Sequence, residues 1–409
     1  MDNKYDFRKY LKKYLKRDLY FAKVEPFIDK EIIKVLIGQR RTGKSYLLYQ
    51  LVDEVQQKNP GSNIIYINKE LSDFDFITGH EELNAFVNRQ TKPGMNYLLI
   101  DEIQDIAGFG KALRNLLATG RYDIYCTGSN AQLLSGDIAG HLSGRFLEIK
   151  VYGLSYNEFL AFHRLESEDD ALQKYMQFGG LPYLIHLELS QDVITEYLTN
   201  VYHTVLFKDV VGRFNIRNVY FLERLVRFLA DNTGSIVSAT QISRYLKAQG
   251  IKISTQTVLD YLGYMTAAML VLKAERETIQ GKKVFETLAK YYFEDWGLRN
   301  AIGGYYPADR SKLMENMVFM HLLICGYKVS VGVEGNREID FVATKNNETI
   351  YVQVTYTLGE EKTVKREFGN LLSVKDNYPK FVVTMDSFTG NSYKGIKHVR
   401  LREFLSQCF

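Results

Sequence analysis

The chain has 409 residues, of which 46% are hydrophobic and 24% charged, and its formal net charge is +4. No apolar run approaches the ~18 residues of a membrane span, and the charged N-terminus excludes a secretory signal peptide. The length predicts two or three domains with an ordinary soluble composition, and the mildly basic charge permits a nucleic-acid partner without requiring one.

Cysteine usage points to a reducing compartment. The three cysteines, Cys126, Cys325 and Cys408, lie far apart in the sequence. Their spacing predicts neither a metal site nor a disulfide framework, so we expect a cytoplasmic protein.

The first 25 residues are rich in Lys and Arg and predict a basic amphipathic helix. Its apolar side chains, at helical spacing, are Phe7, Tyr10, Leu11, Tyr14 and Leu15. The sequence favours a helix docked on the domain that follows, with contact to DNA or a membrane as the alternative.

Residues 38–45 read GQRRTGKS and fit the G-x-x-x-x-G-K-S pattern of a phosphate-binding P-loop. An apolar strand is expected before the loop, at 32–37, and a helix after it, at 46–52. The loop amides and the helix N-terminus would cradle phosphates, Lys44 would reach the β- and γ-phosphates, and Ser45 would ligate Mg²⁺. The residues expected to bind ATP are Gly38, Gln39, Arg40, Arg41, Thr42, Gly43, Lys44, Ser45 and Tyr46.

Two acids follow a later apolar strand in the form of a Walker B element. A strand is expected at 64–68 and another at 96–100, and the second leads directly into Asp101 and Glu102. Phosphoryl transfer needs a charge-neutralising metal and a positioned nucleophile. We expect Asp101 to hold Mg²⁺ through water and Glu102 to polarise the attacking water.

A further strand, at 123–127, ends in small polar residues. Ser129 and Asn130 are the candidates for sensing the γ-phosphate. Arg145 follows soon after and is open to three interpretations, an arginine finger, a sensor in the same chain, or a structural residue.

These segments resemble a large group of prokaryotic AAA-like ATPases. The segments that carry the resemblance are 38–45, 99–104, 127–130, 142–145, 153–159 and 179–182. The resemblance implies that the ATPase domain is joined to a C-terminal domain of unknown function, which combines a winged helix with a nuclease-like fold.

A helical lid is expected at about 155–210, followed by a winged helix at 215–285. Three helices are expected there, at 221–229, at 241–246 with Ser238 as the N-cap, and from Ser254, with wing strands at 268–272 and 282–285. Residues 205–290 hold 13 Lys or Arg and 7 Asp or Glu. That excess favours contact with a phosphate backbone, and the alternative is a winged helix used only for packing.

The last segment predicts a mixed α/β fold that resembles the restriction-endonuclease fold. Helices are expected at 313–318 and 362–372, and strands at 337–342, 350–355 and 381–384. Active members carry acids that bind metal and a lysine that steadies water. Here Asp340 and Glu315 fit, but Gln353 and Thr355 stand where Glu-x-Lys is expected.

The predicted fold class is therefore α/β, with a P-loop parallel-sheet domain at 1–152, a helical lid at 153–212, a winged helix at 213–286 and an inactive nuclease-like domain at 287–409. The predicted function is a Mg²⁺-dependent ATPase that acts as a DNA-associated motor or switch. The alternatives are a nucleotide-gated regulator that binds only proteins and an ATP-dependent nuclease. The expected ligands are ATP or ADP and Mg²⁺, DNA is expected at the winged helix, and an oligomer is permitted.

Overall fold

The computed structural model describes residues 6–9, 13–131, 144–279, 284–335, 337–359, 361–386 and 392–409. The chain forms two compact units. Unit 1 comprises Met1–Tyr152 with Ala267–Met269, and unit 2 comprises Gly153–Thr266 with Leu270–Phe409.

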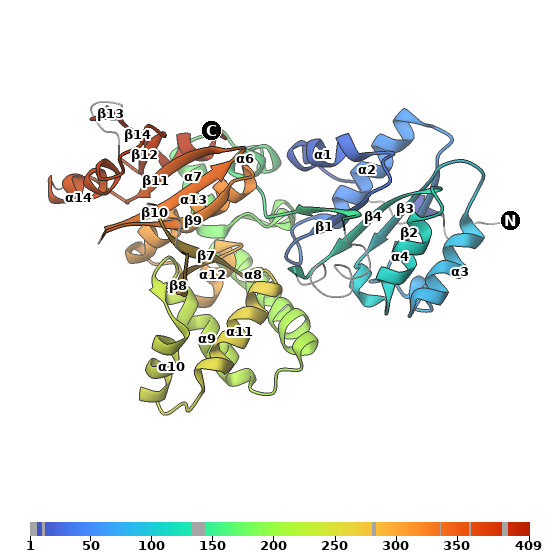
Figure 1. Ribbon diagram of the computed structural model, residues 1–409, viewed down its shortest axis with the longest axis horizontal. Coiled ribbons are helices and arrows are strands. Elements are labelled where there is room, and N and C mark those ends of the chain that lie inside the picture. Colours follow the sequence, from blue (N-terminus) through green and yellow to red (C-terminus); the bar gives the residue numbers. More distant parts are fainter. Residues whose placement is uncertain are drawn as a thin grey trace. The chain divides into compact units, whose positions relative to one another are not determined.

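Unit 1 is built on a five-stranded parallel sheet with the order β2-β3-β4-β1-β5 (Figure 1). The strands are β1 (Ile33–Ile37), β2 (Asn63–Asn68), β3 (Asn96–Asp101), β4 (Tyr122–Gly128) and β5 (Phe146–Lys150). The helices are α1 (Asp18–Val24), α2 (Lys44–Lys58), α3 (His80–Gln90) and α4 (Phe109–Leu117), with 3₁₀ turns at Glu25–Phe27, Ser72–Phe74 and Ile103–Asp105. The predicted parallel α/β sheet is confirmed.

The sheet order explains where the polar residues gather. Strand β1 is buried at every position, including Lys34, whose ammonium pairs with Asp123 of β4. Strand β4 lies between β1 and β3. Because all strands are parallel, the segments that follow β1, β3 and β4 leave the sheet at the same edge.

The N-terminal segment docks on unit 1 without forming the predicted helix. Of the described residues 6–9 and 13–17, only Phe7–Lys9 form a 3₁₀ turn and 13–17 have no helix, while residues 10–12, with the predicted Tyr10 and Leu11, lie outside the described part. The Tyr14 hydroxyl donates to Asp53 on α2 at 2.7 Å, and Lys16 pairs with Glu54 at 2.8 Å. Contacts with α2 therefore override the helical periodicity of this short segment.

The first half of unit 2 is helical. Its helices are α6 (Tyr156–His163), α7 (Asp169–Phe178), α8 (Gln191–Thr204), a π-helix at Val205–Gly212, α9 (Val219–Asp231), α10 (Ala239–Ala248) and α11 (Thr255–Ala267), with a 3₁₀ turn at Pro182–His186. Ser155 caps α6 and Ser238 caps α10, each in a capping box with the residue three positions on. The N-cap predicted at Ser238 is confirmed.

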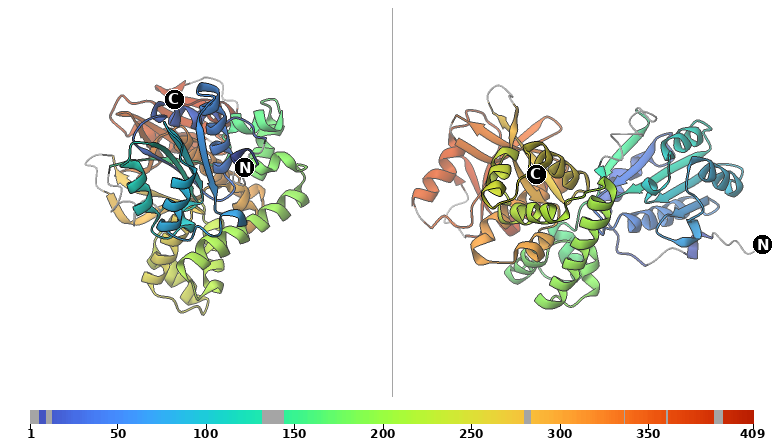
Figure 2. Two further views of the ribbon diagram at one scale, coloured as in Figure 1. Left: turned by 90° about the vertical axis from the view of Figure 1, so that its right-hand side faces the viewer. Right: turned by 90° about the horizontal axis from the view of Figure 1, so that it is seen from below.

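The second half of unit 2 holds a nine-stranded sheet with the order β13-β14-β12-β11-β10-β9-β7-β8-β6, which Figure 2 shows in two further views. The strands are β6 (Ile236–Val237), β7 (Val271–Thr278), β8 (Val284–Phe293), β9 (Lys328–Glu334), β10 (Arg337–Lys345), β11 (Glu348–Val354), β12 (Lys380–Thr384), β13 (Ser392–Tyr393) and β14 (Ile396–Arg400). The remaining helices are α12 (Trp296–Gly303), α13 (Arg310–Ile324), α14 (Glu361–Leu372) and α15 (Leu401–Leu405), with a 3₁₀ turn at Pro307–Asp309.

Helices cover both faces of this sheet. Phe368 of α14 belongs to the cluster around Val382 of β12, whereas Phe404 of α15 packs against the neighbouring Phe381 with ring centroids 6.1 Å apart. Successive strand residues point to opposite faces, so α14 and α15 lie on opposite sides. No helix in the described part of the chain is both long enough and apolar enough to cross a membrane.

Two features of unit 2 differ from the sequence-based expectations. The predicted boundary between residues 286 and 287 falls inside β8, and β7 pairs in parallel with β9, so one sheet spans both predicted domains. A disulfide also joins Cys325 to Cys408, although no disulfide was predicted. The two cysteines are 83 residues apart, so their spacing in the sequence does not indicate that they pair. Only the fold brings α13 and the segment after α15 together.

Candidate nucleotide-binding site

The loop between β1 and α2 has the backbone of a phosphate cradle. A Cβ atom at Gly38 would lie 2.1 Å from the Val151 carbonyl oxygen, so only glycine fits there. Gly43 has a φ of +92°, in the left-handed region, and it directly precedes the first turn of α2. The loop therefore brings its backbone and the α2 N-terminus to one place, as phosphate binding requires.

Lys44 is folded back over this loop. Its ammonium donates hydrogen bonds to the carbonyl oxygens of Gly38 and Gln39, each at 2.9 Å, and its side chain is buried. Within the described part of the chain it forms no ion pair. A buried ammonium held only by neutral carbonyls can exchange them for anionic phosphate oxygens.

Asp101 and Ser45, the two predicted metal ligands, are in contact. Asp101 ends β3 with 1% of its surface exposed, and its carboxylate accepts hydrogen bonds from the hydroxyls of Ser45 and Thr127. Burial raises the pKa of Asp101 to about 6. A hydroxyl beside a desolvated carboxylate is a hard oxygen set that fits Mg²⁺.

Glu102 lies next to Asp101 but in a different electrostatic environment. Burial alone would raise the pKa of Glu102, but the charges of Lys44 and Arg40 outweigh burial and lower it. Its backbone is left-handed, with φ +58°, and the Gln104 amide donates to its carboxylate. The structure therefore holds an ionised carboxylate directly after β3. A group that polarises water must be ionised in this way.

The other predicted residues divide into those at this edge of the sheet and those away from it. Ser129 and Asn130 are buried immediately after β4, and the Gln104 amide that contacts Glu102 also lies 3.4 Å from the Ser129 hydroxyl. In the loop, Thr42 donates to the Gln39 carbonyl oxygen at 2.9 Å.

Arg40 bonds Glu70 at 2.6 Å, while Arg41 and Tyr46 are exposed. The Gln39 side chain is fully buried, and neither its amide nitrogen nor its oxygen has a hydrogen-bond partner in the part of the chain that the structure describes.

Arg145 lies elsewhere in unit 1. It precedes β5, whose first residue Phe146 is opposite Ile33 at the amino end of β1, and its side chain is exposed. The P-loop leaves β1 at the opposite end. The structure therefore does not bring Arg145 to the P-loop of the same chain, which leaves contact with another copy or a structural role.

Two residues at the site were not predicted. Arg17 is buried and donates from its guanidinium to the carbonyl oxygens of Thr42 and Tyr152, both at 2.9 Å, so it supports the P-loop from behind. Nothing in the sequence marks it. Thr127 joins Asp101 to the Glu102 amide. Thr127 lies near the end of β4, which pairs with β3. This position could have indicated that its hydroxyl lies close to the two acids.

A second polar cluster lies in unit 2, where the nuclease-like site was predicted. Lys290 of β8 lies 2.7 Å from Glu315, 3.0 Å from Glu338 and 3.4 Å from Asp340. Burial opposes the charge of Lys290, but the three carboxylates outweigh it and raise the pKa above its ordinary value. Lys365 of α14 is exposed and pairs with Glu361 rather than with these carboxylates.

The comparisons with known proteins agree with the geometry of unit 1. Residues 30–160 match the family described as an AAA domain, and residues 169–309 match a domain of unknown function (DUF8612). An uncharacterized protein of Haemophilus influenzae is 35% identical over 401 residues, covering 96% of this chain and 99% of that protein. An uncharacterized protein of Methanocaldococcus jannaschii is 29% identical over 390 residues, which cover 88% of this chain and 84% of that protein.

Among solved structures, the chain is similar to the Aeropyrum pernix ORC1 protein in complex with DNA, with 12% identity, a TM-score of 0.31 and a match that covers 71% of this chain and 92% of that chain. The AAA match includes the P-loop, both acids after β3 and the end of β4. The Haemophilus influenzae match extends over nearly the whole chain. The chain therefore belongs to the same family as that protein, a family of AAA-type P-loop proteins.

Proposed function

We propose that this protein binds ATP and hydrolyses it with Mg²⁺, as a motor or switch associated with DNA. The contact of Ser45 with Asp101, beside an ionised Glu102 and a Lys44 held only by carbonyls, supports this most directly. These are the groups that phosphoryl transfer requires at one place.

Each residue has a separate proposed role. Loop residues from Gly38 to Tyr46 surround the phosphates, and Lys44 contacts the β- and γ-phosphates. Ser45 and, through water, Asp101 would hold Mg²⁺, which neutralises phosphate charge when it is bound. Glu102 polarises the attacking water, and Ser129 and Asn130 sense the γ-phosphate.

The test is calorimetric titration with Mg·ATP. Lys44→Ala removes the buried ammonium and should abolish measurable binding, because no other cation of the loop is held at that place. Lys58→Ala, on the same helix, removes an exposed lysine that pairs with Glu25 and serves as the matched control. Equal affinities for wild type and Lys44→Ala would refute the proposed site. Asp101→Asn should weaken binding only when Mg²⁺ is present.

The proposed DNA contact lies in the segment from α9 to β8. Its order of helix, strand, two helices and two strands, with β6 pairing antiparallel to β8, supports a winged helix. Arg244, Lys247 and Lys252 are exposed on and after α10. Lys282 and Lys283, in the wing strand expected at 282–285, lie outside the described residues.

One observation favours the alternative of a protein partner. Helix α11, in the position of a recognition helix, contains no Lys or Arg. It exposes 49% of Leu259, and α10 exposes 49% of Tyr245. A helix that exposes apolar side chains and whose charged residue is an acid, Asp260, suits a protein surface better than the phosphate backbone.

Two measurements separate these functions. Stimulation of ATP turnover by single- or double-stranded DNA is expected for the DNA-associated switch and not for a regulator that binds only proteins. Changing Arg244, Lys247 and Lys252 together to Ala should weaken DNA binding and lower the slope of log affinity against log salt by up to about three. The control changes three other exposed lysines of unit 2, Lys328, Lys375 and Lys397. An unchanged affinity and slope would move the contact elsewhere or remove it.

A further inference from the structure

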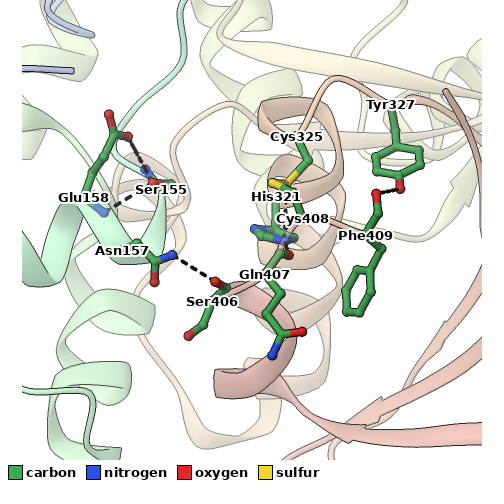
Figure 3. Close-up of a disulfide and its surroundings, with 10 residues drawn as sticks. All are labelled: Ser155, Asn157, Glu158, His321, Cys325, Tyr327, Ser406, Gln407, Cys408 and Phe409. Atoms are coloured by element: carbon green, nitrogen blue, oxygen red, sulfur yellow. Dashed lines mark hydrogen bonds between the residues drawn. A yellow bond between two sulfur atoms is a disulfide. The ribbon is translucent and has the colours of Figure 1, made fainter. Parts of the chain in front are cut away.

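Three potential metal ligands meet in unit 2, apart from both clusters described above. Cys325 and Cys408 form the disulfide, and the His321 ring nitrogen Nε2 lies 3.6 Å from the Cys325 sulfur (Figure 3). One ligand atom from each of the three side chains lies within 4.8 Å of the other two.

Two of these ligands are fixed on one helix. His321 and Cys325 are four residues apart, within and at the end of α13, so both side chains project from the same face. Both are buried. Cys408 is exposed and comes from the segment after α15. The helix thus supplies a rigid pair of ligands and the last segment supplies a third.

The spacing of the helical pair fits a tetrahedral zinc ion. Zinc–sulfur bonds of about 2.3 Å and zinc–nitrogen bonds of about 2.0–2.1 Å at a tetrahedral angle place sulfur and nitrogen about 3.5–3.6 Å apart. The observed separation of Nε2 and the Cys325 sulfur is 3.6 Å. The contact of Nε2 with the Gln407 carbonyl oxygen, at 2.8 Å, holds the imidazole beside the sulfur atoms before any metal binds.

The segment that carries Cys408 is held by contacts other than the disulfide. Asn157 donates to the Ser406 carbonyl oxygen at 3.0 Å, Tyr327 donates to an oxygen of Phe409, and Figure 3 shows both contacts flanking the disulfide. The Phe409 ring also packs against Phe381 and Phe404, with centroids 4.8 Å and 5.0 Å away. Cys408 therefore stays beside Cys325 when the sulfur–sulfur bond is broken.

We propose that the reduced chain binds one Zn²⁺ ion through His321, Cys325 and Cys408, and that the disulfide is the metal-free state of the same site. A dithiol reductant supplies two electrons and two protons to the disulfide, which becomes two thiols, while the reductant becomes a disulfide. Zn²⁺ then displaces the two thiol protons into solvent and accepts the Nε2 lone pair. His321 gives up its 2.8 Å contact with the Gln407 carbonyl oxygen, the proton that Nε2 donates there passes to solvent, Nδ1 takes one up from solvent, and a water can take the fourth position.

The test uses the full chain, reduced with a phosphine and desalted without oxygen, with Co²⁺ as a spectroscopic probe. The reduced wild type should bind one Co²⁺ per chain with sulfur-to-cobalt charge-transfer absorption, and an equimolar amount of Zn²⁺ should remove that absorption. The disulfide form should neither bind Co²⁺ at this site nor show the charge-transfer absorption. Cys325→Ser and Cys408→Ser should each lose most of the absorption.

Cys126→Ser is the matched control, because Cys126 is a buried free cysteine of unit 1 and its loss should leave the absorption unchanged. His321→Gln keeps both thiols and separates metal binding from misfolding, with the far-ultraviolet circular dichroism compared with that of wild type. A folded His321→Gln chain with undiminished Zn²⁺ affinity, or a reduced wild type without charge-transfer absorption, would overturn the proposal.

Discussion

The Thr127 hydroxyl accepts a hydrogen bond from the Glu102 amide at 2.9 Å and donates one to the Asp101 carboxylate. A single side chain on β4 therefore fixes both acids that follow β3. The hydrogen bond to the amide also holds Glu102 in its left-handed backbone conformation, with φ +58°, which is costly for a residue other than glycine.

Thr127→Val tests this arrangement because valine has nearly the same shape and lacks the hydroxyl. It leaves the Glu102 amide without its buried acceptor, which costs about 1–3 kcal/mol of stability. We expect ATP turnover to fall by about tenfold or more, which corresponds to at least ~1.4 kcal/mol. The measurements are urea unfolding and steady-state ATPase rates. Thr119→Val is the control, at an exposed residue just after α4 whose hydroxyl donates to the Leu116 carbonyl oxygen at 2.7 Å. Wild-type turnover in Thr127→Val would show that the acids are positioned without it.

Glu102→Gln should keep Mg·ATP affinity and reduce turnover by about 10²-fold or more, because an amide of the same size cannot accept a proton from water. Calorimetry and a phosphate-release assay measure the two effects separately. Glu81→Gln, an exposed acid in the first turn of α3, is the matched control. If Glu102→Gln turns over ATP as fast as wild type does, the general base is another residue.

His163 predicts how stability changes with pH. Burial lowers the pKa of His163 to about 4, and its Nε2 has no hydrogen-bond partner among the residues that the structure describes. The unfolded chain takes up a proton near pH 6.5 while the folded chain does not, so stability is lost as the pH falls from about 6.5 to 4. Between pH 7 and 5 the wild type should lose about 1–2 kcal/mol more than His163→Gln in urea unfolding. The exposed His186→Gln is the control, and equal losses in wild type and His163→Gln would contradict the prediction.

We expect unit 2 not to cut DNA. Glu315 and Asp340 could ligate a metal, but the Lys290 ammonium lies between them and Glu338, and Gln353 and Thr355 supply no further charge. A metal ion would have to displace a buried ammonium that three carboxylates stabilise. The pure protein should leave linear, circular and branched DNA intact in Mg²⁺ or Mn²⁺, with or without ATP. Cleavage that disappears in Asp340→Ala would establish a nuclease instead.

The secondary structure of unit 1 could be predicted from the sequence because each strand is a short apolar run. The strands expected at 32–37, 64–68 and 96–100 correspond to β1, β2 and β3. The N-terminal segment could not be predicted, since its helical periodicity competes with tertiary contacts such as that of Tyr14 with Asp53. A periodicity in one short segment contains no information about those contacts.

At the candidate site, the sequence predicted residues that belong to a local motif. It did not predict residues whose contacts connect segments that are far apart in the sequence. Lys44, Ser45, Asp101 and Glu102 belong to recognisable local patterns, and the structure brings them together. Arg17 acts through the backbone of Thr42 and Tyr152, at positions 25 and 135 residues away. Any residue type can supply a backbone carbonyl oxygen, so the partner's identity does not indicate such a hydrogen bond. The role of Arg17 can therefore be seen only in the three-dimensional structure.

The passage of β8 through the predicted boundary has a mechanical consequence. The strand pairs with β6 on one side and β7 on the other, and β7 continues the sheet through β9. Helix α10 begins two residues after β6, which is hydrogen-bonded into this sheet. A force that moves α10 therefore acts on the continuous sheet, because no flexible linker separates the two predicted domains at this point. Limited proteolysis should release no separate fragment at residues 286–287, and a partner that tilts the helices of this segment must tilt the whole sheet.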